Sequence, residues 1–124
     1  ALDRIRDSYN VNGLGQTAAL ATLSDIGHYR KQFEHIVQWR TKTTGALEAL
    51  GFEVLPSQAN FIFARPTGIT AAEWFQQLRV RKILTRWFDA PKVRDWLRIT
   101  IGTETEMRKF LSATRAIHRA NRPP

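Results

Sequence analysis

Apolar side chains recur at three- and four-residue steps through the first half of the chain, which is the spacing of one face of an α-helix. Ser24 or Asp25 can cap this helix at its start, and Gly51 favours the left-handed backbone that ends a helix. A shorter, alanine-rich helix is expected just before it, at 16–23. The predicted apolar stripe of the long helix consists of Tyr29, Phe33, Ile36, Val37, Thr44, Leu47 and Leu50.

Two further helices are predicted to begin at residue pairs that form a capping box. Thr70 with Glu73, and Thr103 with Glu106, each place a hydroxyl and a carboxylate where both can bond backbone N–H groups at a helix start. Apolar residues follow each pair at helical spacing. The predicted buried positions are Trp74, Phe75 and Leu78 in the first helix, and Met107, Phe110, Leu111, Thr114 and Ile117 in the second.

The remaining apolar segments have the composition and alternation of β-strands. Segments 52–55 and 60–64 flank a proline-marked corner, and segments 83–88 and 96–101 are separated by a turn. Helices and strands then follow one another in an order typical of the α+β class. We expect a small mixed or antiparallel sheet of about four strands, with helices packed on one face and the other face left to water or a partner.

Composition is consistent with one globular domain. The chain has 124 residues, of which 43% are hydrophobic, and chains of this length commonly form a single core. No apolar run approaches the roughly 20 residues that a transmembrane helix needs, so we expect no membrane partner. The chain has no cysteine and its three histidines occur singly, so neither a disulfide nor a metal site is predicted. The default location for such a chain is the cytoplasm.

The formal net charge is +8, and arginines outnumber lysines. Arginine binds phosphate and carboxylate through a planar fork of donors, so this balance favours recognition of anions. A basic nucleic-acid-binding module is one alternative, because Arg79, Arg81 and Lys82 lie close together in the sequence. The basic residues are otherwise spread along the chain and interrupted by apolar ones, which disfavours nucleic acid as a partner.

Two arginines lie in predicted strands that are otherwise apolar. Arg98 alternates with Leu97 and Ile99, so its side chain must point away from the face that those two residues bury. It could be a surface arginine paired with an acid such as Glu104, or it could line a ligand-binding cleft. Arg86 raises the same question within its own segment. Two such arginines could bind one phosphate, but their spacing does not show whether their strands are neighbours.

Five segments of this chain, in their order and spacing, resemble the C-terminal part of histidinol-phosphate aminotransferases. They are RDSYNVN at 6–12, LGFEV at 50–54, PSQANF at 56–61, ILTRWF at 83–88 and LRITIGT at 97–103. Together they cover nearly the whole chain. One departure is local, because members of that family commonly have a glycine just before the ILTRWF-like strand, where this chain has Val80, Arg81 and Lys82.

The resemblance implies a fold-type-I pyridoxal-phosphate enzyme, normally a homodimer, that transfers an amino group between histidinol phosphate and 2-oxoglutarate in histidine biosynthesis. This chain would supply the small domain at 13–120, with 1–12 as a linker from the large domain and 121–124 as a tail. A threonine-phosphate decarboxylase or an aromatic aminotransferase would keep much the same small domain, so these relatives remain alternatives.

The resemblance also implies that substrate-binding residues lie in this chain and catalytic residues lie elsewhere. In that family the arginines of the LRITIGT-like and ILTRWF-like strands hold the acidic group of the substrate, which by motif are Arg98 and Arg86 here. Asn60 is a further candidate, for the rim of the site. The Schiff-base lysine of the family belongs to the large domain, and no lysine here lies in its motif. We therefore expect this chain alone neither to bind the cofactor tightly nor to transaminate.

Overall fold

The computed structural model describes residues 11–121, which divide into two compact units between Glu34 and His35. The first unit contains α2 (Gly13–Ser24) and the start of α3 (Ile26–Glu48). Both helices lie where the apolar spacing predicts them. No residue of α2 is buried. The second unit contains the rest of α3 and all the elements that follow it.

Some of the predicted boundaries fall outside the described residues. The linker predicted at 1–12 is described only at Val11 and Asn12, so most of the RDSYNVN segment lies outside as well. The predicted tail at 121–124 is described only at Asn121. The extent of the predicted small domain stays a prediction.

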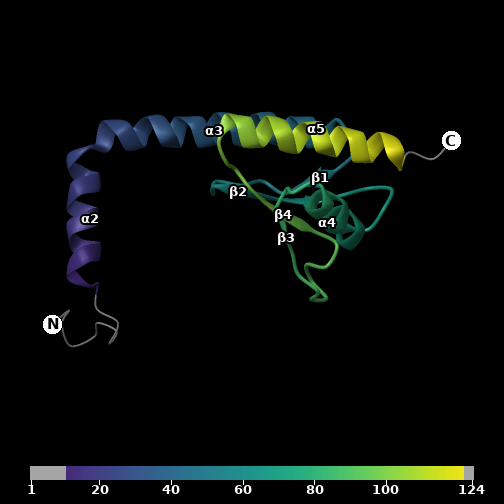
Figure 1. The fold of residues 1–124 in the computed structure, drawn as a ribbon, viewed down its shortest axis with the longest axis horizontal. Coiled ribbons are helices and arrows are strands. Elements are labelled where there is room, and N and C mark those ends of the chain that lie inside the picture. Colours follow the sequence, from purple (N-terminus) through teal and green to yellow (C-terminus); the bar gives the residue numbers. More distant parts are fainter. Residues whose placement is uncertain (1–10, 122–124) are drawn as a thin grey trace. The chain divides into compact units, whose positions relative to one another are not determined.

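The second unit is built on a four-stranded sheet with helices on one face (Figure 1), so the predicted α+β class is confirmed. The strands are β1 (Glu53–Val54), β2 (Phe61–Arg65), β3 (Arg86–Trp87) and β4 (Leu97–Thr100). Their order in the sheet is β1-β2-β4-β3, and every neighbouring pair is antiparallel. β4 is therefore a central strand, with β2 on one side and β3 on the other.

The remaining helices, α4 (Ala71–Val80) and α5 (Glu104–Ala120), begin at the predicted capping boxes. At α5 the backbone N–H of Thr103 donates to Glu106 Oε2 at 2.7 Å, and the N–H of Glu106 donates to Thr103 Oγ1 at 3.4 Å. The same pair of bonds forms at the start of α4. Every residue that the spacing predicts to be buried in α5 is buried.

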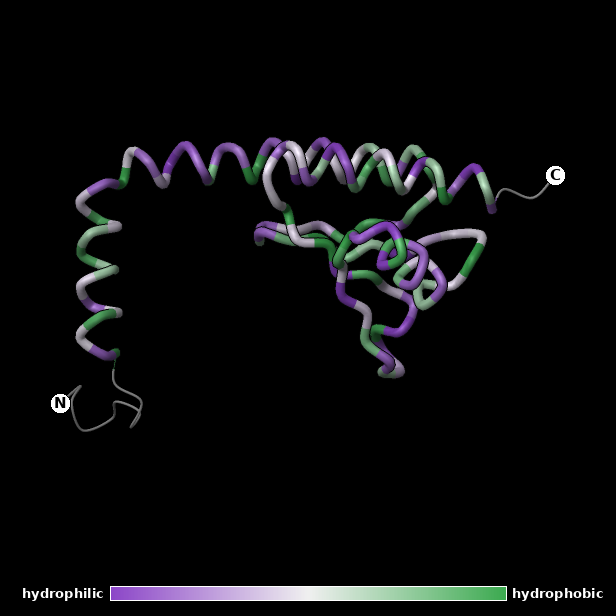
Figure 2. The backbone as a smooth tube through the Cα atoms, viewed as in Figure 1, coloured by the Kyte–Doolittle hydropathy of each residue, from purple (hydrophilic) through white to green (hydrophobic). Residues whose placement is uncertain are grey.

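The core of this unit lies between one face of the sheet and the helices. Ile62 and Ala64 of β2, with Leu97 and Ile99 of β4, are each at most 3% exposed. They share one face because alternate residues of a strand point the same way. α5 and the second half of α3 lie side by side over this face (Figure 1). Figure 2 shows hydrophobic and hydrophilic segments alternating along α5, as expected for a helix with one face on a core.

The buried face of α3 agrees with the predicted apolar stripe only in part. Leu47 is buried as predicted, and Ile36 and Leu50 pack half-buried against the core. Phe33 and Val37 also belong to the stripe, but they are 54% and 48% exposed. Trp39 and Thr43, which the stripe omits, are buried with Leu47 at successive four-residue steps. Helical spacing is compatible with more than one face, and the neighbouring elements decide which face is covered.

The strand predicted at 83–88 is shorter than expected and pairs only over Arg86–Trp87. After α4 the chain turns through Lys82, whose φ of 58° lies in the left-handed region. The N–H of Ile83 then donates back to the carbonyl of Leu78 at 3.0 Å, so this segment follows the helix end and the ladder with β4 starts late. The other strands agree with their predicted ranges to within one residue at each end.

Two negative findings apply to residues 11–121. No helix in this range is long and apolar enough to cross a membrane. The same range contains no group of three or more His, Asp or Glu side chains placed to hold a metal ion. Among the histidines, His35 is half-buried, and its Nε2 lies 3.4 Å from the carbonyl oxygen of Gly102.

The capping boxes predict how the free energy of unfolding depends on pH. The hydroxyl and backbone N–H of Thr70 hold the pKa of Glu73 below its ordinary value of 4.5. The backbone N–H and hydroxyl of Thr103 lower the pKa of Glu106 in the same way. Because these carboxyls bind protons less readily in the folded chain, their contribution to stability is complete above pH 4.5 and is lost as the pH falls below that value.

Urea unfolding at a series of pH values from about 6 down to about 3 measures this dependence. The double variant Glu73→Gln/Glu106→Gln is expected to show a shallower fall in the free energy of unfolding than the parent chain. The matched control is Glu48→Gln, an exposed position in the last turn of α3, which should follow the parent. An equally steep fall in the double variant would contradict the assignment of the pH dependence to the capping boxes.

Candidate anion-binding site

Arg98 and Arg86 lie on the sheet face opposite the core. Arg98 alternates with the buried Leu97 and Ile99, as predicted, so its side chain projects from the other face. The register of β3 and β4 places Arg86 directly across from Arg98. Residues directly opposite in an antiparallel pair have side chains on the same face, with Cβ atoms about 5 Å apart. The structure therefore places the two arginines opposite each other on neighbouring strands, which the sequence could not show. Their guanidinium groups extend toward different rings, that of Phe61 for Arg98 and that of Phe88 for Arg86.

Neither guanidinium has an acidic neighbour in the described part of the chain. Glu104, considered above as a partner for Arg98, instead accepts a hydrogen bond from Arg108 Nε at 2.7 Å. That bond lowers the pKa of Glu104 from its ordinary value. The ion pairs formed by residues 11–121 include neither Arg86 nor Arg98. Two like charges directly opposite in a sheet repel each other, and a bound dianion would offset this repulsion.

Aromatic rings flank the arginines on this face. The guanidinium carbon of Arg98 lies 4.7 Å from the centre of the Phe61 ring, which meets Phe63 edge to face at 6.0 Å between centroids. Arg86 is exposed, with its guanidinium carbon 6.0 Å from the centre of the Phe88 ring. The sequence-based site omits these rings. Their alternation with the buried residues of β2 is the signal that could have identified Phe61 and Phe63.

A third arginine on the same face already has a counter-charge. Arg65 is the register partner of Glu53 and forms an ion pair with it. The guanidinium carbon of Arg65 also lies 5.4 Å from the centre of the Trp96 ring. Arg65 is therefore stacked on an aromatic ring, as Arg98 is, but its carboxylate partner makes it a weaker candidate for binding an external anion.

Asn60 lies at the corner that leads into β2. Its side chain is exposed, and its backbone carbonyl oxygen accepts a hydrogen bond from the backbone N–H of Ile101 at 2.8 Å. Ser57 holds this corner, because its hydroxyl donates to the carbonyl of Phe61 at 2.6 Å and accepts from the N–H of Ala59 at 3.1 Å. The structure describes no hydrogen bond from the Asn60 amide to either arginine. The role of Asn60 at the rim of the site stays a prediction.

An open pocket of about 290 Å³ adjoins Arg98 through the rings of Phe61 and Phe63. Its other lining residues belong to the corner segment and are Leu55, Pro56, Ser57, Gln58 and Ala59. Five of the seven lining residues are apolar, and Ser57 and Gln58 are the polar ones. An organic group attached to an anion at the arginines would meet apolar surface here.

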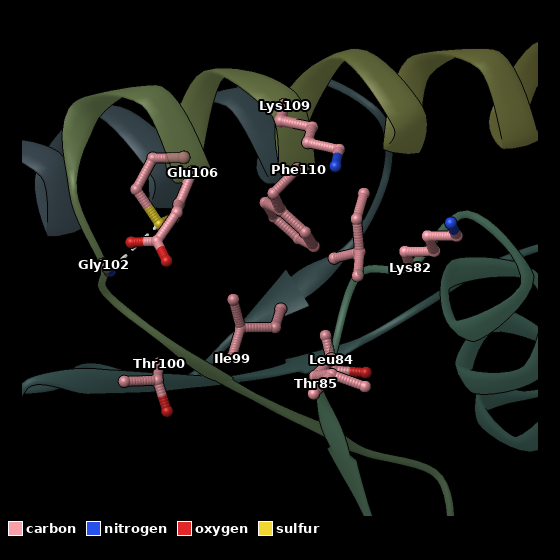
Figure 3. Close-up of a pocket in the computed structure, with 11 residues that line it drawn as sticks. Lys82, Leu84, Thr85, Ile99, Thr100, Gly102, Glu106, Lys109 and Phe110 are labelled. Carbon is pink, nitrogen blue, oxygen red and sulfur yellow. Dashed lines mark hydrogen bonds between the residues drawn. The ribbon is translucent and has the colours of Figure 1, made fainter.

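A second pocket, of about 400 Å³, contains neither arginine. Figure 3 shows Ile99 and Phe110 facing each other across it, with the ammonium groups of Lys82 and Lys109 toward one side and the carboxylate of Glu106 toward the other. The Glu106 carboxylate is already bound to the start of α5. This pocket is separate from the predicted site, because none of Arg86, Arg98 and Asn60 lines it.

No lysine of the described residues is placed to hold a cofactor covalently. A lysine that forms a Schiff base is activated by a desolvated pocket or a neighbouring cation. The lysines of this chain are all exposed: Lys31, Lys42, Lys82, Lys92 and Lys109. Being exposed, none of these lysines has the desolvated setting that would activate it as an anchor for pyridoxal phosphate.

Comparison with known proteins places these observations in a family. The family model for class I and II aminotransferases matches residues 1–113. Among curated proteins, the histidinol-phosphate aminotransferase of Microcystis aeruginosa is 39% identical over 120 residues, which cover 97% of this chain and 34% of that protein. The chain therefore spans about a third of the length of the curated relatives that it matches.

Solved structures agree on the fold. The histidinol-phosphate aminotransferase from Clostridium acetobutylicum superposes with a TM-score of 0.80 at 22% identity, covering 96% of this chain and 37% of that one. The histidinol-phosphate aminotransferase from Sinorhizobium meliloti, solved in complex with pyridoxal-5'-phosphate, has a TM-score of 0.74 at 21% identity. The match covers 96% of this chain and 33% of that one.

The facing arginines predict an unusual response to loss of a charge. Arg86→Gln is expected to raise the free energy of unfolding by about 0.2–1 kcal/mol at low salt in buffer without phosphate, because it removes a like-charge pair. The gain should shrink at high ionic strength, where the repulsion is screened. Urea unfolding at two salt concentrations measures both effects.

The matched control is Arg79→Gln, which removes an exposed arginine from the last turn of α4. A positive charge there interacts favourably with the helix dipole, so this variant should not gain stability. Destabilisation by Arg86→Gln at low salt would show that the two guanidinium groups do not repel each other in the folded chain.

Proposed function

This chain belongs to the class I and II aminotransferase family, and we propose that it is the small, substrate-binding domain of a pyridoxal-phosphate-dependent aminotransferase that acts on histidinol phosphate. The relative named above is 39% identical over 120 residues, which cover 97% of this chain, and has that activity in its name. The strand order β1-β2-β4-β3 places Arg86 and Arg98 on neighbouring strands, as the proposal requires. The fold is that of a solved histidinol-phosphate aminotransferase. The amino-group acceptor would be 2-oxoglutarate, in histidine biosynthesis.

One observation carries the proposal: Arg86 lies directly opposite Arg98 on the sheet face away from the core, without a carboxylate partner for either in the described residues. Guanidinium groups bind phosphate and carboxylate through paired N–H donors. In the proposed function these two side chains bind the phosphate of histidinol phosphate and, in the other half-reaction, a carboxylate of the keto acid. Asn60 would lie at the rim.

The rest of the full-length protein would hold the cofactor. Pyridoxal phosphate acts as an electron sink for carbanions next to the reacting nitrogen, and it needs a lysine that this chain does not place suitably. The role proposed for this chain is to bind the distant acidic group of the substrate and so fix its orientation. Binding energy at such a remote group lowers the barrier of the reaction when it holds the reacting atoms in position. A homodimer in the cytoplasm is part of the same proposal.

Steady-state kinetics of the full-length protein test the proposed role of Arg98. Arg98→Ala is expected to lower kcat/KM for histidinol phosphate by roughly 10²–10³-fold, the effect of removing one partner from a desolvated charge pair. The loss should be much smaller for histidinol, which lacks the phosphate. Arg94→Ala removes an exposed arginine that pairs with Asp89 and is the control. Equal losses on both substrates would overturn the assignment of Arg98 to the phosphate.

The same assay separates the alternative substrates. Transamination of aromatic amino acids in preference to histidinol phosphate, or decarboxylation of threonine phosphate, would replace the proposed substrate while leaving the two arginines as binders of an acidic group. The facing pair is selective for charge, so it favours substrates with a phosphate or a second carboxylate.

The isolated 124-residue chain is expected to be inactive. Mixed with pyridoxal phosphate, it should not develop the visible absorbance of a cofactor bound covalently to a specific lysine, because its lysines are exposed. Absorbance spectra at increasing cofactor concentration, with borohydride reduction and peptide mapping, measure this. Stoichiometric labelling of one lysine would contradict the proposed division of roles between this chain and the rest of the protein.

A further inference from the structure

The side chain of Arg98 leans away from its register partner. Phe63 lies directly across from Arg98 in the β2–β4 pair, while Phe61 lies across from Thr100. The guanidinium of Arg98 nevertheless sits over the ring of Phe61, 4.7 Å from its centre. The side chain therefore extends along β4 toward Thr100, and a ring on the neighbouring strand sets where its charge lies.

In this position only the two Nη atoms of Arg98 can donate hydrogen bonds to a ligand. Its Nε is buried and has no hydrogen-bond partner among the described residues. A buried N–H of a charged group is costly to leave unpaired, and the negative face of an aromatic ring supplies some of the missing electrostatic stabilisation. An anion from solvent cannot reach a buried Nε, so it must approach the two Nη atoms.

The Phe61 ring is held in place by a neighbouring ring and by two constraints on the Phe61 backbone. Phe63 meets it edge to face, with an angle of 75° between the ring planes. The Phe61 carbonyl accepts from the Ser57 hydroxyl at 2.6 Å, which ties the start of β2 to the preceding corner. The strand register with Thr100 fixes the backbone. The ring is therefore a pre-organised support that exists before any ligand arrives.

Arg65 provides an internal comparison. It is also stacked over a ring, that of Trp96, but its guanidinium is bound by Glu53. Stacking alone therefore does not create an anion site. At Arg98 the same kind of stacking occurs with no carboxylate in the described residues to use the free end of the guanidinium.

We propose that Phe61 is a positioning residue for the anion site: its ring holds Arg98 so that the anion binds end-on, through the two Nη atoms. The proposal rests on the proposed function, in which these arginines bind the acidic group of the substrate. It assigns to the PSQANF segment a role in substrate binding that acts through Arg98, without direct contact with the reacting atoms.

The test uses the full-length protein loaded with its cofactor, so that the probe does not enter the site of the cofactor's own phosphate. The probe is inorganic phosphate, and its dissociation constant is measured by isothermal titration calorimetry. Phe61→Leu is expected to weaken binding by roughly 3- to 10-fold, the effect of losing one cation–π contact at a partly desolvated site. Phe61→Tyr, which keeps the ring, should bind as the parent does.

Trp96→Leu is the matched control, because it removes the ring under Arg65, an arginine on the same face that Glu53 already pairs. It should bind phosphate as the parent does. Phe61→Met, which keeps apolar volume without a ring, replaces Phe61→Leu if that variant fails to fold. Parent-like affinity in the ring-less Phe61 variant, or equal losses in the Phe61 and Trp96 variants, would overturn the proposal.

Arg98→Ala separates this proposal from the one on which it rests. If Arg98→Ala binds phosphate as tightly as the parent, the proposed role of the arginine itself is wrong. If Arg98→Ala weakens binding while loss of the Phe61 ring does not, only the positioning role is wrong. A crystal structure of the loaded protein with phosphate gives the geometry: contacts to both Nη atoms support end-on binding, and a contact to Nε overturns it.

Discussion

The antiparallel pairing of β2 with β4 is the contact on which both the core and the candidate site depend. Its register sets Ile62 opposite Ile99 and Phe63 opposite Arg98. The first pair faces the helices and is almost completely buried. The second pair lies on the other face. A shift of one residue would exchange these faces, burying an arginine and exposing an isoleucine, so burial of the core also fixes the face on which the arginine lies.

Local sequence patterns predict the elements of this chain well because the determinants are themselves local. A capping box requires only a residue pair at fixed spacing, and both Thr70 and Thr103 cap a helix as expected. Strand alternation in β4 is equally local, so the outward direction of Arg98 follows from its two neighbours. The α+β class then follows from the order of the elements.

Strand register, and the choice of which helix face is buried, depend on contacts between distant parts of the chain, so local sequence patterns do not predict them. The pairing of Arg86 with Arg98 depends on how β3 lies beside β4, which no spacing within either strand determines. The ring under Arg98 could not be assigned for the same reason. Helix α3 shows the same limit: apolar spacing correctly predicts that Leu47 is buried, but it also selects the exposed Phe33 and Val37 and omits the buried Trp39. Which face of the helix is covered depends on the elements packed against it.

Comparison of Arg65 with Arg98 shows what distinguishes an arginine paired within the fold from one proposed to bind a ligand. Both guanidinium groups lie over aromatic rings on the same face, so stacking and position are shared. They differ in counter-charge, because Glu53 lies across from Arg65 whereas a second arginine, Arg86, lies across from Arg98. An arginine opposite a carboxylate is satisfied within the fold. An arginine opposite another arginine lacks a counter-charge within the sheet, so a bound anion would stabilise Arg98 more than Arg65.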